Sequence, residues 1–583
     1  MRILINQFRG LTNKSHEPGG LFQAHNIRIK NSKIYTIPDP ISLYSNIWSQ
    51  NGLYVWGYGG DSKIVAFGNT KIDYNGNYFD NSNQRLIPVY TLLDYTQDKV
   101  TQFDLSPYGV SPNRRIPAVV MGDHLWFNAG SNLFMVALSA SGATSTVPAG
   151  QPVMQPMTVG YESGTASYLV NPPDAKLMVA YKGRVFYAGL SNSLHSVTEA
   201  VTTNNVPKLA AITSKDAKWA YKPNQVVFSE PYQPNAIKVW SFIGIEDYEA
   251  EITGMVSWNH TLFIFTRRGV WGYTGDDPLT ATMERIPDVD GCVNSDTIKI
   301  VGRTLFWVGP YGVNFMTTKG AGKVDGLDKL FGLDLVANDA TTGQEFPYMD
   351  FSKLQAASSD NYGYYVLTTG TNEMILVDES SKQASIFQSN DIIPYAAVGV
   401  GQANIGGAYC DVILGVQNSA ATDSISALLW DGGPGTSRVG MIIPDINKRI
   451  TWRTADVSIY NMGRIVNPPA GQGMQIVVQD KESLAPPTSP LPAIKPRGWE
   501  DIDPITSDTS SGFRLSPLGT TSGSKLPTSS YAHFVSHVDV RSSSPVVGIF
   551  LETNRSVAID SIVLDAGPEP ASAPSAGILQ GGG

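Results

Sequence analysis

The sequence predicts an all-β protein: a β-propeller of six or seven blades followed by a C-terminal β-sandwich-like domain. Two adjacent segments, 258–275 and 301–316, share one order of polar turn, apolar strand, Gly-containing turn and second apolar strand. They align at an offset of 43 residues, from Leu262 to Leu305, and a propeller blade takes roughly 40 to 50 residues. Similar strand pairs recur along the chain, and 56 glycines and 37 prolines suit the many turns of such a fold.

Composition limits the class of protein further. A chain of 583 residues is too long for a single core, so two or more domains are expected. Hydrophobic residues make up 42% and charged residues only 16%, which argues against a disordered chain or a coiled coil. The net charge of −9 argues against tight binding to phosphate backbones, because that affinity comes from Lys and Arg.

The order of elements begins with an N-terminal arm, residues 1–50, that contains one strand pair. Residues 26–30 and 34–37 form the pair, Asn31 and Ser32 form its turn, and Pro38 ends it. The propeller is expected over 51–440, with loop insertions because its strand pairs are unevenly spaced. Besides the two central units, the candidate pairs are 53–58 with 64–67, 125–127 with 133–136, 177–181 with 184–187, 364–367 with 374–377, and 411–414 with 426–430.

The C-terminal part has a different texture. A β-rich domain is expected over 441–566, and 567–583 reads as a flexible tail. Its candidate strands are 450–457, 474–479, 534–540, 546–551 and 557–564, interrupted by a Pro/Ser-rich stretch. Helical spacing is confined to a turn or two near 325–335, on a loop between strands.

No complete catalytic, cofactor-binding or metal-binding motif is found. His533 and His537 fall on one face of a strand, but no third ligand is close in the sequence. The acidic pair at 276–277 reads as a turn with an Asx-type cap, and the pairs at 288–290 and 325–328 lack the full ligand ladder of a calcium loop. Glycine-rich 57–60 and 399–401 read as turns or bulges, not phosphate cradles. We therefore expect no catalytic residue, no cofactor and no metal.

Other side chains have a structural interpretation beside a functional one. Arg267 and Arg268 lie at a hairpin tip, as a solvated turn or as an ion-pair contact between subunits. Cys292 and Cys410 are expected to be buried free thiols instead of a disulfide. Six tryptophans recur about once per unit, which favours packing between blades over sugar stacking: Trp56, Trp126, Trp258, Trp271, Trp307 and Trp430.

Three segments resemble one protein family. They are 18–30 with 34–38, then 221–230 with 235–240, and most specifically 254–316, with Phe263-Ile-Phe265 and Gly269-Val-Trp-Gly-Tyr-Thr-Gly275. Discontinuously over 15–320, the chain resembles the β-propeller tail proteins of short-tailed bacteriophages. These are the tail nozzle, also called tail tubular protein B, and the related head–tail hub or stabilisation proteins. The chain is short for a nozzle with an extra platform domain, so it resembles the compact hub type more closely.

The resemblance implies a structural role in the virion tail, after synthesis in the host cytoplasm. It implies a homo-hexameric ring below the portal and adaptor rings, through which genomic DNA passes without specific binding. Tail fibres or a needle would attach distally, and residues 1–25 and 567–583 are candidate straps across neighbouring subunits. No apolar run approaches the roughly 20 residues of a membrane helix, so no membrane insertion is expected.

Two alternatives remain open at this point. One is a tail propeller that binds host glycan through aromatic or acidic loops, and the other is a polysaccharide depolymerase. A glycosidase needs two carboxylates at a set separation, and with 51 acidic residues the sequence alone does not single out a pair.

Overall fold

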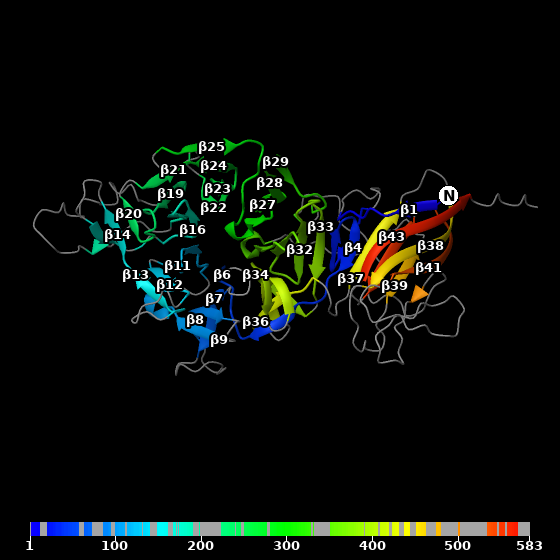
Figure 1. Cartoon of the computed structure of the whole chain (residues 1–583), viewed down its shortest axis with the longest axis horizontal. Coiled ribbons are helices and arrows are strands. Elements are labelled where there is room, and N and C mark those ends of the chain that lie inside the picture. Colours follow the sequence, from blue (N-terminus) through cyan, green and yellow to red (C-terminus); the bar gives the residue numbers. More distant parts are fainter. Residues whose placement is uncertain are drawn as a thin grey trace, which may run out of the picture.

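The computed structural model is an all-β protein (Figure 1). It describes residues 2–11, 20–21, 23–56, 63–72, 85–94, 99–110, 114–130, 132–139, 149–160, 167–170, 172, 174–190, 197–198, 223–238, 241–245, 250–276, 280–327, 330–331, 350–389, 391–405, 408–418, 422–430, 437–443, 450–461, 474–479, 500–501, 533–544, 547–553 and 557–568. Within these ranges, helix is limited to 3-10 turns such as Ser295–Thr297, and no helix is long and apolar enough to span a membrane.

Seven antiparallel four-stranded units follow one another in the described residues, and we number them blades 1 to 7. Blade 1 comprises β6 (Gly52–Trp56), β7 (Lys63–Ile72), β8 (Arg85–Asp94) and β9 (Lys99–Asp104); blade 2 comprises β10 (Ala118–Met121), β11 (His124–Ala129), β12 (Asn132–Ala137) and β13 (Pro152–Gln155); blade 3 comprises β16 (Leu177–Tyr181), β17 (Arg184–Ala188), β19 (Gln225–Phe228) and β21 (Phe242–Gly244). Blade 4 comprises β22 (Ile252–Trp258), β23 (Thr261–Thr266), β24 (Val270–Thr274) and β25 (Thr282–Ile286); blade 5 comprises β26 (Lys299–Val301), β27 (Thr304–Gly309), β28 (Gly312–Thr317) and β29 (Gly320–Lys323). Blade 6 comprises β30 (Gln355–Ser359), β31 (Tyr364–Thr368), β32 (Glu373–Asp378) and β33 (Ala384–Gln388); blade 7 comprises β34 (Ile392–Ile405), β35 (Ala408–Asn418), β36 (Asp423–Leu428) and β5 (Ile41–Ser45).

Seven apolar clusters join these blades into a closed ring. Six of them lie between consecutive blades, from blades 1 and 2 to blades 6 and 7. The seventh joins blade 7 to blade 1, with Ile413 and Ile425 packed beside Leu53 and Ile64. The first strands of most neighbouring blades are in contact, as β16 is with β22, so these strands are innermost around the axis. The architecture is a seven-bladed β-propeller, the upper of the two predicted numbers.

The middle strands of the blades are buried on both faces, which explains the apolar runs that predicted them. In β23, Leu262 and Ile264 belong to the cluster shared with blade 3, while Phe263 and Phe265 belong to the cluster shared with blade 5. A strand that is buried on both faces is a continuous apolar run and does not alternate. All seven predicted strand pairs are confirmed as antiparallel neighbours.

The ring is closed by a strand from the N-terminus. β5 pairs with β36, with Tyr44 opposite Ile425 and Ile41 opposite Ala427, and becomes the outermost strand of blade 7. The chain then runs through Ile47, which is buried between blades 7 and 1, into β6. Blade 7 therefore joins residues 41–45, before the first blade in the sequence, to residues 423–428, near the end of the propeller.

Blade 6 continues into a second β structure. β33 pairs in parallel with β2 (Gln23–His25), β2 pairs with β37 (Ser437–Ile443), and the sheet extends through β42 (Val547–Thr553), β39 (Met474–Gln479) and β40 (Glu500–Asp501). A separate sheet contains β3 (Ile27–Lys30), β4 (Lys33–Thr36), β43 (Val557–Pro568), β38 (Ile450–Asn461) and β41 (His533–Ser544), with β1 (Arg2–Ile5) paired to β43. We call β1–β4 with β37–β43 the C-terminal β region. It lies beyond blade 6 at one end of the molecule (Figure 1).

The N-terminal 50 residues do not form a separate arm in the described structure. The predicted strand pair is confirmed as β3 and β4, turning at Asn31 and Ser32, which have φ of 52° and 61°. β1 to β4 belong to the C-terminal β region, and β5 belongs to the propeller. The reason is non-local pairing, because β1, β2, β4 and β5 each pair with a strand hundreds of residues later in the chain. Of the predicted tail, residues 569–583 lie outside the described residues.

An additional sheet accounts for one predicted insertion. β14 (Met157–Gly160), β15 (Ser167–Val170), β18 (Val197–Thr198) and β20 (Ala236–Lys238) form it, with β14 and β20 parallel. It lies outside blades 2 and 3, at the end of the molecule opposite the C-terminal β region (Figure 1).

Two smaller predictions concern loops. Near the expected helical turn, the backbone N–H groups of Leu330 and Phe331 both bond to the Leu327 carbonyl, which makes a turn, and the rest of 325–335 is largely outside the described residues. The glycine-rich 399–401 is confirmed as a bulge, since the pairing of β34 with β35 shifts between Gly399 and Ala403. Residues 57–60 lie outside the described residues.

Candidate functional site

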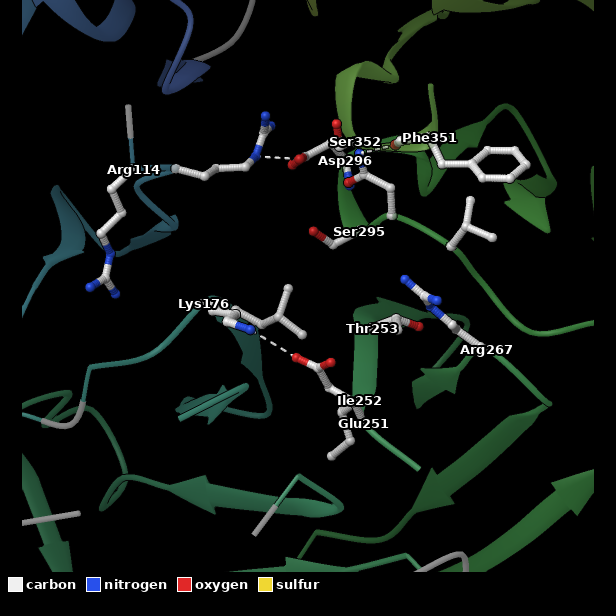
Figure 2. Close-up of a pocket in the computed structure, with 14 residues that line it drawn as sticks. Arg114, Lys176, Glu251, Ile252, Thr253, Arg267, Ser295, Asp296, Phe351 and Ser352 are labelled. Carbon is white, nitrogen blue, oxygen red and sulfur yellow. Dashed lines mark hydrogen bonds and ion pairs between the residues drawn. The ribbon is translucent and has the colours of Figure 1, made fainter. Parts of the chain in front are cut away.

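A cavity of about 570 Å³ lies where the chain enters the innermost strands of blades 2 to 6. Its walls are the segments that lead into these strands, together with the β23–β24 turn (Figure 2). The charged lining residues are Arg114, Arg115, Lys176, Glu251, Arg267 and Asp296. Since innermost strands surround the propeller axis, the cavity is at one mouth of that axis.

Two ion pairs connect the segments at this mouth, and one of them crosses the axis. Arg115, before blade 2, pairs with Asp296, before blade 5, although blades 3 and 4 lie between them in the ring. Lys176 Nζ lies 2.8 Å from Glu251 Oε1 and links the entries to blades 3 and 4. The cross-axis pair is the more buried one, with 32% and 15% of its side chains exposed against 57% and 47%. It therefore contributes more to holding the mouth closed than an exposed pair does.

Local hydrogen bonds position the acidic side of the cavity. The Asn294 side chain accepts a bond from Asp296 N at 3.0 Å and caps the 3-10 turn Ser295–Thr297. Its amide Nδ2 donates to the carbonyls of Phe351 and Leu354, both at 2.9 Å, which ties blade 5 to the entry of blade 6. These contacts fix Asp296 where it meets Arg115.

The β23–β24 turn contributes Arg267. Cys292 N donates to Thr266 O at 2.8 Å, and a Cβ on Gly291 would lie 1.9 Å from that same oxygen. The turn thus packs directly on the segment that leads into blade 5. Figure 2 shows the Arg267 side chain reaching from the turn toward the cavity. Both Arg267 and Arg268 are exposed, in line with the predicted solvated turn.

The cysteines and tryptophans have the structural roles that the sequence predicted. Cys292 and Cys410 are free, buried and in different clusters. Burial raises the pKa of each thiol to about 12, so neither is poised as a nucleophile. The six tryptophans either belong to the clusters between blades or pack against them: Trp56, Trp126, Trp258, Trp271, Trp307 and Trp430.

The predicted turns at acidic pairs are used in other ways. Asp276 pairs with Lys182 of the β16–β17 turn, and Asp290 provides the carbonyl that accepts a bond from Trp307 Nε1 at 3.1 Å. Asp277 and Asp328 lie outside the described residues. His533 and His537 are part of β41, and nothing is described of their side chains. Among the residues whose side chains are described, no three His, Cys, Asp or Glu gather as metal ligands.

Sequence reasoning missed the cavity, although a signal for it exists. The signal is the pair of Arg-Arg doublets in the chain, at 114–115 and 267–268. Arg114 and Arg115 line the cavity together, and Arg267 joins them from the second doublet. Lys176 and Glu251 each directly precede an innermost strand, and Asp296 lies three residues before one, in the 3-10 turn that leads into β26. The positions of these residues relative to the innermost strands can be identified only when the first strand of each blade is known.

Comparisons with known proteins identify no family for this chain. No family model matches the chain, and no curated protein matches it. It is similar to the β-propeller domain of Cps50 (Swd1) from Myceliophteria thermophila, with 10% identity and a TM-score of 0.35, covering 68% of this chain and 99% of that one. It is similar to BamB from Moraxella catarrhalis, with 11% identity and a TM-score of 0.34, over 68% and 98% of the chains. It is also similar to the computationally designed Ika8 protein, with 11% identity and a TM-score of 0.32, over 67% and 100%. The propeller itself is established by the strand pairing and the closed ring of clusters.

Proposed function

We propose that this chain is a structural component of a short-tailed bacteriophage tail, a nozzle or hub protein without catalytic activity. In this proposal it forms a homo-hexameric ring below the portal and adaptor, conducts and retains genomic DNA, and anchors tail fibres or a needle. The basis for the family is the sequence resemblance, of which the most specific part, 254–316, builds most of blades 4 and 5.

The observation that carries the proposal is how the described aromatic and acidic side chains are used. A sugar-binding propeller presents aromatic faces to solvent, whereas the tryptophans named above pack between blades. A glycosidase needs a pair of carboxylates available for acid and base work, whereas Glu251 and Asp296 of the cavity are both held in ion pairs. Within the described residues, these groups serve rigidity, which suits a structural part.

The architecture supports the same proposal. The sheet of blade 6 continues through β2 into the C-terminal β region. The propeller and the C-terminal β region are therefore joined by a hydrogen-bonded sheet as well as by chain connections. The added sheet and the C-terminal β region lie at opposite ends, so the molecule offers two different surfaces. A closed ring of identical subunits needs two different, complementary patches of this kind.

The proposal also says where DNA would run. The Arg115–Asp296 pair crosses one mouth of the propeller axis, and the first strands around that axis contact one another. A passage for DNA would therefore be enclosed between subunits and not within one propeller. The net charge of −9 is compatible with a wall that repels phosphates.

Mass photometry of the purified full chain tests the ring: a species of six subunits, formed without added metal or sugar, is expected. An image of the virion with this chain labelled would then place it in the tail.

A persistent monomer that binds glycans on an array would favour the receptor-binding alternative. Release of reducing ends from host polysaccharide, abolished by a single Asp or Glu substitution, would favour the depolymerase. Micromolar binding of duplex DNA to the ring at low salt would contradict the conduit.

A further inference from the structure

The cavity at the propeller mouth carries a charge opposite to that of the whole protein. Four cationic side chains line it, Arg114, Arg115, Lys176 and Arg267, against the two carboxylates of Glu251 and Asp296. The chain as a whole has 51 acidic and 42 basic residues. A concave surface lined by an excess of one charge concentrates ions of the opposite charge.

Pairing inside the protein accounts for three of these cations. Arg115 pairs with Asp296, Lys176 pairs with Glu251, and Arg114 pairs with Asp174 just outside the lining. Among the described residues, no carboxylate pairs with Arg267. Its guanidinium, with five N–H donors, is thus the cation of the lining that no described carboxylate neutralises.

Polar side chains also line the cavity. Ser295 lines the cavity, and its hydroxyl has no hydrogen-bond partner among the described residues (Figure 2). The Thr253 hydroxyl, in contrast, already donates to the Cys292 carbonyl at 2.6 Å. One guanidinium and one hydroxyl therefore remain available to an incoming acceptor, and the charge of Arg267 is the one that no carboxylate of the lining offsets.

We propose that this cavity binds a small multivalent oxyanion, with Arg267 as the group that anchors it. Guanidinium binds carboxylate and phosphate oxygens through two parallel N–H bonds, which suits this ligand class. The volume of about 570 Å³ is within the range of pockets for small organic ligands, about 300 to 1,000 Å³. An organic phosphate and a polycarboxylate share the required chemistry, and the experiment distinguishes them.

The test uses the full chain at low salt, with pyrophosphate and citrate as separate probes in isothermal titration calorimetry. Binding is expected for at least one probe, with a thermal midpoint that rises with ligand concentration and an affinity that falls as salt is added. The probe that binds more tightly identifies the phosphate or the carboxylate class. No heat with either probe at about 10 mM, well above a weak affinity of about 1 mM, would overturn the proposal.

The two arginines of one turn provide a matched pair of variants. Arg267→Ala should weaken binding about tenfold, the effect of losing one charge-assisted contact of about 1.4 kcal/mol. Arg268→Ala removes the same charge from the same exposed turn but not from the cavity lining, so binding should be unchanged. Equal weakening in both variants would show general attraction to a positive surface and would overturn the site. The result is independent of ring formation, so it does not depend on the proposed function.

Discussion

Blade 5 and blade 7 occupy equivalent places in one ring but are assembled differently. Blade 5 takes β26 to β29 from one continuous stretch, whereas blade 7 takes β34 to β36 from the second half of the chain and β5 from residues 41–45. Their clusters are equally well buried, with Trp307 and Trp430 exposed by 0% and 1%. Equal packing can thus be reached by local folding, as in blade 5, or by pairing of strands from distant parts of the chain, as in blade 7. Blade 7 is complete only once β5 has paired with β36.

The largest expected effect comes from removing the closing strand. A chain that starts at residue 46 lacks β1 to β5, which opens blade 7 and uncovers the cluster shared with blade 1. We expect no cooperative thermal unfolding transition by circular dichroism, because an unpaired sheet edge and an exposed apolar cluster favour aggregation. A synthetic peptide of residues 38–47 added in trans should restore part of the transition.

A chain that starts at residue 7 is the control for this truncation. It lacks only β1, an edge strand paired with β43 in the C-terminal β region. The propeller transition should be retained there. A chain from residue 46 that melts like the full protein would mean that β5 is dispensable, and the contrast between blades 5 and 7 would fail.

The two tryptophans sharpen the contrast at single residues. Trp307→Ala and Trp430→Ala should each lower the free energy of unfolding by about 3–5 kcal/mol, as expected for large buried aromatic side chains. If blade 7 forms last, the kinetics should differ: Trp307→Ala slows refolding, whereas Trp430→Ala mainly accelerates unfolding. Stopped-flow fluorescence measures both rates. An identical division of the effect between folding and unfolding would argue against late closure.

The joint between blade 6 and the C-terminal β region should have a smaller effect. Asn26 has a φ of 54°, and its side chain donates to Gln388 O at 2.8 Å and accepts from Gln388 N at 2.5 Å. Asn26→Ala should cost about 2–3 kcal/mol, from the lost hydrogen bonds and the left-handed backbone. Asn26→Gly removes the backbone term and should cost less. Urea denaturation compares the two, and equal losses would mean that the backbone conformation contributes nothing.

The smallest expected effect is a pH dependence at the interface of blades 6 and 7. Burial raises the pKa of Asp411, against hydrogen bonds from Ser359 and Trp430 that lower it. The folded chain then keeps a proton that the unfolded chain releases, so stability falls as pH rises from 3.8, the ordinary aspartate value, through the raised folded value. Asp411→Asn should remove this decline in thermal midpoints measured over that interval.

Asp350 is the control of opposite sign. Hydrogen bonds from Ser352 lower the pKa of its exposed carboxyl, so its contribution is present above the ordinary aspartate value and is lost as pH falls below it. Asp350→Asn should therefore leave the decline above that value intact. A decline unchanged in Asp411→Asn would assign it to another buried group.

The sequence predicted middle strands well and outer strands poorly, for a physical reason. β27 is buried along its whole length, so it appears as an apolar run. β25 and β29 are outermost, mostly exposed or half-buried, and have no such pattern. In blades 1 and 3 the predicted pairs are the first two strands, whereas in the other blades they are the middle two. The sequence therefore predicts pairs of strands, but not which two of the four strands of a blade they are. For that reason it does not predict the cavity-lining positions that precede each first strand.

By itself, the sequence determined the all-β class, the repeat across blades 4 and 5, the packing of the tryptophans between blades, the burial of both thiols, and the strands of the C-terminal part. These features depend on local apolar runs and turn residues, which a short window of sequence contains. Only the tertiary structure decided the number of blades, the closure by β5, the extension of blade 6 through β2, and the meeting of Arg115 with Asp296. Those features bring together residues that are far apart in the chain, and their pairing depends on the shape of the closed ring, which no local pattern encodes.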